Sequence, residues 1–192
     1  MSVNRILKIF LLLSAVVFFI GCRTISSSRY GSTIVGGKYE ASKDSTSYFV
    51  YPFGSVMIPG KWEKTSYNNV SRQQFFMNSD SVILSVVFSR FDGYEFNQDG
   101  AKKGYDFVKA CYEWETDYFE KTNGLQHNII EENEEKHYMI FRVYDSPDGA
   151  KVNMYFLLGE KNGNVSYFSL SRAEKWTEER RLEFLRGLLN NP

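Results

Sequence analysis

Residues 154–170 read MYFLLGEKNGNVSYFSL, and this stretch decides what kind of fold the chain can form. Two runs rich in aromatic and aliphatic residues flank the pair Asn162-Gly163. That pair favours a two-residue type I′ turn, because both central positions of such a turn need a positive φ. The stretch therefore predicts two antiparallel strands, Val152–Glu160 and Val165–Ser171, that are joined as a β-hairpin.

Further strands are predicted before this hairpin. Residues 81–89 read SVILSVVFS, which is too apolar for a half-exposed strand and indicates a strand inside the sheet. Residues 78–80 (NSD) are a turn signal that joins this segment to the predicted strand Gln73–Met77. The other predicted strands are Tyr48–Tyr51, Ser55–Ile58, Asn128–Glu132 and His137–Asp145.

Two segments have the period of a helix instead of a strand. From Asp99 to about Lys121, apolar residues recur on one face and charged residues lie largely opposite, so we predict an amphipathic helix. Asp99 is its candidate N-cap and Asn123-Gly124 its stop. A second helix is predicted from Thr177 to Leu189. Together these elements predict an α+β fold, with a mainly antiparallel β-sheet packed against a long central helix and a C-terminal helix.

The composition is that of a globular protein. The 192 residues are 43% hydrophobic and 17% aromatic, which is enough for a packed core. The 23 basic and 23 acidic residues give no net charge, so we expect no nucleic-acid partner. The two cysteines exclude a disulfide-rich scaffold. We expect a single folded domain at residues 48–192.

The beginning of the chain has the pattern of a signal peptide. Two basic residues precede an apolar run, Ile9–Gly21, that is shorter than the roughly 20 residues of a membrane-spanning helix. The run ends in residues 19–22 (FIGC), which resemble the lipobox of bacterial lipoproteins. The resemblance implies that residues 1–21 are removed and that the thiol of Cys22 carries the lipid. The alternative is an ordinary secretory signal, cut for instance after Ser28.

Residues 22–47 are predicted to be the lipidated cysteine and a flexible tether. The segment is rich in Ser, Thr, Gly and Lys and can bury little apolar surface, although Ile34-Val35 could instead form a short edge strand. In this reading the protein contacts the membrane through the lipid on Cys22. Arg23 stands where many lipoproteins of the inner membrane carry Asp. The resemblance therefore implies a cell-envelope position, at the outer membrane and facing the periplasm if the source is Gram-negative.

Two stretches of the expected domain resemble the PsbP-like superfamily, which includes the extrinsic photosystem II protein and bacterial DcrB-type lipoproteins. One is residues 53–62 (FGSVMIPGKW), and the other is the hairpin at 154–170, which leads to Trp176 and a C-terminal helix. The order of elements is also similar over most of residues 48–190. The resemblance implies a central antiparallel sheet with helices on both faces and a largely non-catalytic role.

The sequence offers little chemistry for catalysis. The common hydrolase, metalloprotease, nucleotide-binding and redox motifs are absent from it. We expect His127 and His137 at the surface, and Cys111 as a small buried hydrophobe on the apolar side of the long helix. We accordingly predict no catalytic residue, no metal site and no cofactor.

One cluster of charge is a candidate interaction surface. The glutamates Glu131, Glu132, Glu134 and Glu135 form an acidic turn. They are either a solvated hairpin tip that discourages edge-to-edge association, or a ligand or partner surface. The leading hypothesis is a membrane-anchored cell-envelope lipoprotein, a non-enzymatic binding or accessory module with an envelope protein as partner. The alternatives are a carrier of a small apolar ligand and, behind it, a hydrolase without a recognisable motif.

Overall fold

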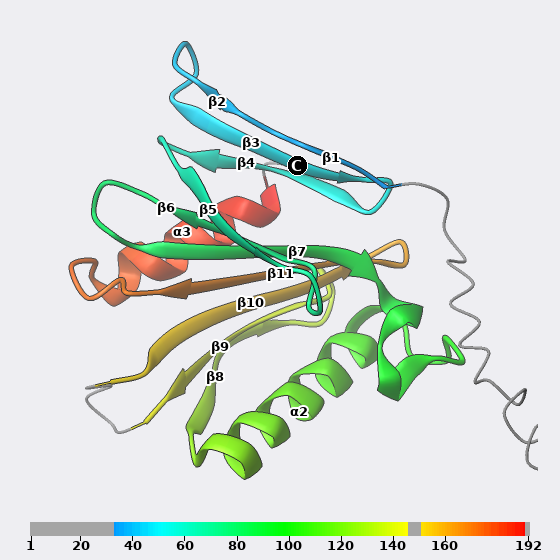
Figure 1. Ribbon diagram of the computed structural model, residues 1–192. Helices are drawn as coiled ribbons and strands as arrows, with labels where there is room; N and C mark the ends of the chain where they lie inside the picture. Colours follow the sequence, from blue (N-terminus) through cyan, green and yellow to red (C-terminus); the bar gives the residue numbers. More distant parts are fainter. Residues whose placement is uncertain (1–32, 146–150, 191–192) are drawn as a thin grey trace, which may run out of the picture. The chain divides into compact units, whose positions relative to one another are not determined.

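The structure is a computed structural model that describes residues 33–145 and 151–190. Its largest sheet has seven antiparallel strands: β5 (Glu63–Asn68), β6 (Gln73–Met77), β7 (Ile83–Arg90), β8 (Gln126–Asn133), β9 (Tyr138–Tyr144), β10 (Asn153–Lys161) and β11 (Asn164–Ser171). Their order across the sheet is β5-β6-β7-β11-β10-β9-β8 (Figure 1). The predicted strand at residues 81–89 is β7, which pairs on both sides and so lies inside the sheet.

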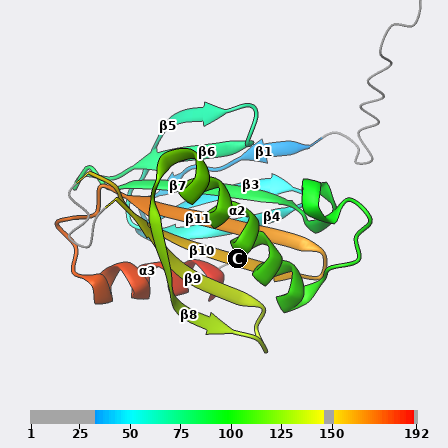
Figure 2. The same cartoon turned by 90° about the horizontal axis from the view of Figure 1, so that it is seen from below.

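Other elements cover both faces of this sheet. A smaller sheet contains β1 (Ile34–Gly36), β2 (Tyr39–Glu40), β3 (Ser45–Tyr51) and β4 (Gly54–Pro59), and the helices are α2 (Gly104–Asn123) and α3 (Glu178–Asn190). Two 3-10 turns, η1 (Phe91–Gly93) and η2 (Glu95–Asn97), connect β7 to α2. The small sheet and α3 lie on one face, and α2 crosses the other (Figures 1 and 2). The α+β fold predicted from the sequence is therefore confirmed.

The hairpin at the centre of the sheet forms as the sequence predicts. Lys161 pairs with Asn164, so the loop between β10 and β11 has two residues. Those residues, Asn162 and Gly163, have φ angles of 54° and 82°. Both values are positive, as a type I′ turn requires.

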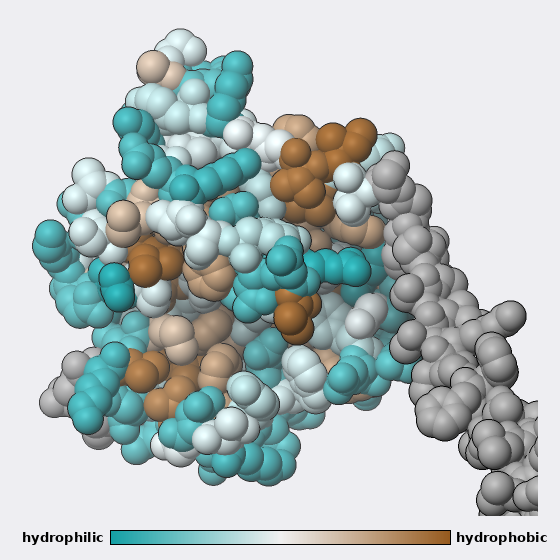
Figure 3. Space-filling view, in the orientation of Figure 1, coloured by the Kyte–Doolittle hydropathy of each residue, from teal (hydrophilic) through white to brown (hydrophobic). Residues whose placement is uncertain are grey.

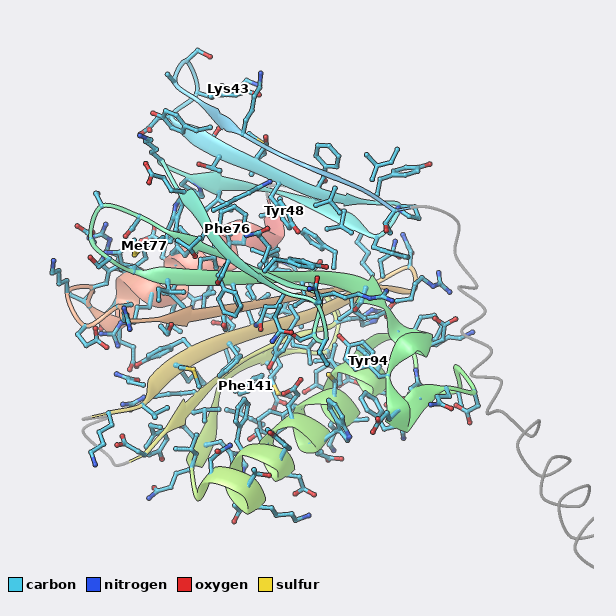
Figure 4. The ribbon with its side chains drawn as sticks, in the orientation of Figure 1. Lys43, Tyr48, Phe76, Met77, Tyr94 and Phe141 are labelled. Carbon is cyan, nitrogen blue, oxygen red and sulfur yellow. The ribbon has the colours of Figure 1, made fainter. Side chains whose placement is uncertain are left out.

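Aromatic side chains fill the space between the sheet and α2. Phe107, Val108 and Cys111 of the helix are fully buried. Phe141 and Phe156 stack on the facing strands with their ring centroids 4.9 Å apart. Figure 4 shows Phe141 and Tyr94 on the side of the sheet that faces α2. Burial of several such rings, each worth about 1.5–3 kcal/mol, holds the helix on the sheet.

A second core lies between the two sheets and beside α3. Tyr48 of β3 packs edge-on against Phe76 of β6, with ring centroids 5.3 Å apart, and Figure 4 shows both between the sheets. Trp62 and Trp176 are each 4% exposed. The Trp176 indole N–H donates to Asp80 over 2.9 Å, which fastens the segment before α3 to the turn between β6 and β7.

The folded domain begins earlier than residue 48. Ile34 pairs with Tyr51 across β1 and β3, which confirms the edge strand considered for Ile34-Val35. Ser47 exchanges two hydrogen bonds of 3.1 Å with the backbone of Lys38. Backbone pairing to β3 therefore orders a segment that buries little apolar surface, and the tether predicted for residues 22–47 is wrong for residues 34–47. The signal peptide, Cys22 and the rest of the expected tether, residues 1–32, lie outside the described residues.

Two further differences concern local signals. The long helix starts at Gly104 instead of Asp99, because Gly100 has a φ of +67° and the buried Asn97 side chain bonds the backbone of Lys102 through both its oxygen and its nitrogen. The sequence also contains no signal for β5, because its six residues are all exposed and show no hydrophobic alternation.

Candidate functional site

A groove of about 1190 Å³ opens at the end of the seven-stranded sheet where β10 turns into β11. Segments that are distant in the sequence line it: the start of β4, η1, the start of α2, the turn between β8 and β9, the β10–β11 hairpin and the last turns of α3. It is the largest of the three cavities described for this part of the chain.

The carboxylate of Glu160 holds the floor of the groove together. Glu160 is 6% exposed, and its Oε2 accepts the backbone N–H of Gly104 at 2.6 Å. Its Oε1 accepts the N–H of Gly163 at 2.5 Å, and its own N–H donates to the carbonyl of His137 at 3.0 Å. One buried residue therefore connects the start of α2, the hairpin turn and the end of the β8–β9 turn. Bonds of this charge-assisted type are about twice as strong as neutral ones.

Gly104 allows the close contact between two of these segments. Its φ is +58°, and a Cβ built on it would lie 3.0 Å from the imidazole carbon of His137. A side chain at Gly104 would therefore be strained by its backbone conformation and would also push the histidine ring away. The sequence predicted a surface histidine at 137, and the structure places it half-buried in the groove wall.

Three lysines accompany the three connected segments. Lys103 precedes Gly104, Lys136 precedes His137, and Lys161 follows Glu160. All three side chains are exposed and line the groove. No periodic pattern in the sequence predicts that these lysines lie on one groove, because hydrogen bonds between distant segments place them there.

The acidic turn predicted as a candidate surface is partly neutralised. Glu131 accepts two N–H bonds from Arg186 of α3, at 2.7 and 2.5 Å, and a third bond from the hydroxyl of Tyr138 at 2.5 Å. The guanidinium of Arg186 lowers the pKa of Glu131 from its usual value, although partial burial opposes this effect. Glu132 accepts a hydrogen bond from the Tyr105 hydroxyl.

The other two glutamates of the cluster remain exposed, and Glu135 lines the groove beside Lys136 while Glu134 does not. The four glutamates therefore do not form one acidic surface, because Glu131 and Glu132 accept hydrogen bonds from other side chains of the domain. Within residues 33–145 and 151–189, no group of three or more His, Cys, Asp or Glu could hold a metal ion.

A separate polar cluster is buried beneath α2. Cys111 is 0% exposed, and burial raises the pKa of its thiol well above the usual value. Burial also raises the pKa of Glu115 on the same helix to about 7. The hydroxyl of Tyr167 is buried near both groups and has no hydrogen-bond partner within the described part of the chain. The expectation that Cys111 is a buried hydrophobe is confirmed, and its protonated thiol is not a candidate nucleophile.

Apolar side chains also gather at the end of the small sheet. Ile34 and Tyr51 are 60% and 65% exposed, and with Phe49 they line a shallow hollow of about 540 Å³. Figure 3 shows hydrophobic residues concentrated at this end of the small sheet. This surface is distinct from the groove in chemistry, because it carries no charged side chain in its lining.

No protein-family model matches the chain, and no curated protein sequence matches it. Among solved structures, the chain is similar to the solution structure of cyanobacterial PsbP (CyanoP) from Synechocystis sp. PCC 6803. The match covers 86% of this chain and 95% of that chain, with 12% sequence identity and a TM-score of 0.49.

Proposed function

We propose that this protein is a membrane-anchored lipoprotein of the cell envelope, whose folded domain binds another envelope component in the groove at the end of the large sheet. The domain acts as a binding or accessory module and not as an enzyme. The observation that carries the proposal is the groove itself. Its floor is held by hydrogen bonds to the buried carboxylate of Glu160, and segments that are distant in the sequence line it. Concave, preformed surfaces of this size are the usual places for ligands.

The anchor part of the proposal rests on the sequence of residues 1–22. A diacylated cysteine holds a protein on a bilayer more firmly than a single chain does. Within residues 33–145 and 151–190, no helix has the length and apolar character to cross a membrane.

The two alternative functions have less support from the geometry. A carrier of an apolar ligand needs an enclosed apolar cavity, but five basic and two acidic side chains line the open groove, and side chains such as Phe107 and Phe141 fill the space beneath α2. A hydrolase needs an activated nucleophile, but the Cys111 thiol is buried and protonated at neutral pH. A ring nitrogen of His127 is occupied by the Tyr112 hydroxyl at 2.8 Å.

The anchor is tested by replacing the sulfur that would carry the lipid. In cells that express Cys22→Ser, we expect the protein in the soluble fraction or as an unprocessed precursor, because serine cannot accept the lipid at neutral pH. Mass spectrometry of the wild-type mature terminus should show a chain that begins at Cys22 with a fatty-acid adduct. An uncut wild-type chain, or unchanged membrane association of the variant, would refute the anchor.

The groove is tested separately by filling it. We expect Asn164→Trp, which places a large ring in the groove lining, to lose the envelope component that co-purifies with the wild-type protein from solubilised membranes. Asn128→Trp is the matched control, because Asn128 is exposed on the edge strand β8 outside the groove. Equal co-purification by both variants, with unchanged unfolding curves, would show that the groove is not the binding surface.

A further inference from the structure

We infer that the groove binds an extended polyanion whose charges are phosphoryl groups, and that Lys103, Lys136 and Lys161 are the residues that recognise it. This inference rests on the proposed function, because it names the chemistry of the ligand for the same groove. It follows from where the three lysines are placed, from how the other charges of the groove are already used, and from the size of the groove.

The three ammonium groups come from segments whose positions are fixed. Each lysine is next in sequence to Gly104, His137 or Glu160. Hydrogen bonds of 2.6 and 3.0 Å hold Gly104 and His137 to Glu160. The lysine backbones are therefore set in place before any ligand arrives. Among residues 33–145 and 151–189, none of the three lysines forms an ion pair within 4.0 Å, unlike Lys43, Lys61 and Lys121, which each pair with a nearby acid.

The two arginines and the buried glutamate of the groove are engaged within the protein. Arg186 is bound to Glu131, and Arg90 pairs with Asp92 at 3.4 Å. The Glu160 carboxylate is buried and accepts an N–H bond on each oxygen, so it is occupied in holding the floor. Glu135 is the other acid of the lining. The groove-lining side chains thus comprise five basic and two acidic residues, in a chain that has equal numbers of basic and acidic residues overall.

Two features favour phosphoryl groups on an extended ligand. A volume of about 1190 Å³ exceeds what a single small anion fills, so one ligand can meet all three lysines only if its charges are spread along it. Lysine ammonium groups act as point charges without the planar fork that matches a carboxylate. A terminal phosphoryl group carries about −1.5 to −2 charges at pH 7 against −1 for a carboxylate, so the ends of such a ligand gain more from these point charges.

The test is a calorimetric titration of the full-length protein, in detergent, with sodium tripolyphosphate. We expect saturable binding that weakens as the salt concentration rises, because exposed charges are screened. Each substitution Lys→Gln at 103, 136 or 161 should weaken binding roughly tenfold, and the triple variant at least about a hundredfold, since one hydrogen bond to a charged group is worth about 1.5 kcal/mol or more. Citrate, a carboxylate of similar charge, should bind at least about tenfold more weakly than tripolyphosphate.

A matched control separates local recognition from general charge. The triple variant with Gln at Lys61, Lys109 and Lys121 removes the same charge from exposed positions outside the groove lining, and it should bind tripolyphosphate within about twofold of the wild type. Monomeric dihexanoyl phosphatidic acid, which has a single phosphoryl group, should bind at least about tenfold more weakly than tripolyphosphate. Tighter binding of that lipid would assign the groove to a headgroup and overturn the polyanion.

Three other results would overturn the inference: no saturable binding by the wild type, equal losses in the two triple variants, or binding of citrate as tight as that of tripolyphosphate. These results are distinguishable from failure of the proposed function. If tripolyphosphate does not bind but Asn164→Trp still loses the envelope component, the groove is a binding surface for a ligand of other chemistry. If Asn164→Trp loses nothing, the proposed function fails whatever tripolyphosphate does.

Discussion

Glu115 is an acid largely buried on α2, and its environment makes a quantitative prediction about stability and pH. Removal from water disfavours the carboxylate, and this burial raises its pKa from 4.5 to about 7. The change corresponds to about 3 kcal/mol in favour of the neutral acid, because each pKa unit is worth about 1.4 kcal/mol. In the unfolded chain the group ionises near its usual pKa of 4.5.

The direction of the effect follows from proton binding in the two states. Between pH 4.5 and 7 the unfolded chain has lost this proton while the folded protein still holds it, so raising the pH favours unfolding. The stabilising contribution of the neutral acid is therefore complete below pH 4.5, is lost progressively up to about pH 7, and changes little above that. Glu115→Gln cannot ionise and should lack this loss.

Urea unfolding of the wild type and Glu115→Gln at pH 4, 6 and 8 measures the effect. We expect the two proteins to unfold with similar free energies at pH 4, and the variant to be more stable by about 3 kcal/mol at pH 8. Glu113→Gln, on the exposed side of the same helix, is the control and should show no such growth of the difference with pH. A difference between Glu115→Gln and wild type that stays constant from pH 4 to pH 8 would refute the burial argument.

Four other perturbations have defined outcomes. Glu160→Ala removes the acceptor of two partly buried backbone N–H groups, so urea unfolding should show a loss of about 2–4 kcal/mol. A loss under about 1 kcal/mol would contradict its role in the groove floor. Trp176→Phe deletes the hydrogen bond to Asp80 and should cost about 1 kcal/mol in the same assay, whereas a neutral result would mean that this bond does not hold the segment before α3. Phe107→Ala should lower the free energy of unfolding by about 3–5 kcal/mol, because the ring is fully buried. A loss near zero would contradict the packing of α2 on the sheet. The Cys111 thiol should react with a thiol reagent at pH 8 only after urea is added, and rapid labelling of the folded protein would show that it is not buried.

Local signals in the sequence predicted the main elements correctly. Asn162-Gly163 specifies its own turn, because few other residue pairs adopt two successive positive φ angles at low cost. The apolar run at residues 81–89 and the stop at Asn123-Gly124 are likewise short-range features, and Gly124 does end α2 with a φ of 65°. The last helix was also predicted, within one residue at each end.

The errors came where tertiary contacts decide the outcome. The sequence predicts a tether where the first strands form, because Ile34–Gly36 buries little apolar surface. Pairing with β3 supplies the backbone partners of this segment. The sequence predicts the start of α2 five residues too early, because Asp99 resembles a helix cap. In the structure the buried Asn97 side chain binds the connecting loop instead.

The groove could not be predicted from the sequence at all. Gly104 and Glu160 are 56 residues apart, and their hydrogen bond has no counterpart in any periodic pattern. Each of the three groove lysines looks like an ordinary surface residue when read alone. The acidic turn was visible in the sequence, but its neutralisation by Arg186 depends on where α3 packs.

The claim that the groove is the binding surface of this protein is tested most directly by photo-crosslinking in intact cells. A photoreactive amino acid is placed at Asn164, in the groove lining, or at Tyr118, which is 58% exposed on α2 outside that lining. We predict that irradiation produces a discrete crosslinked adduct from position 164 and none from position 118. An adduct from position 118 with none from position 164 would contradict the account.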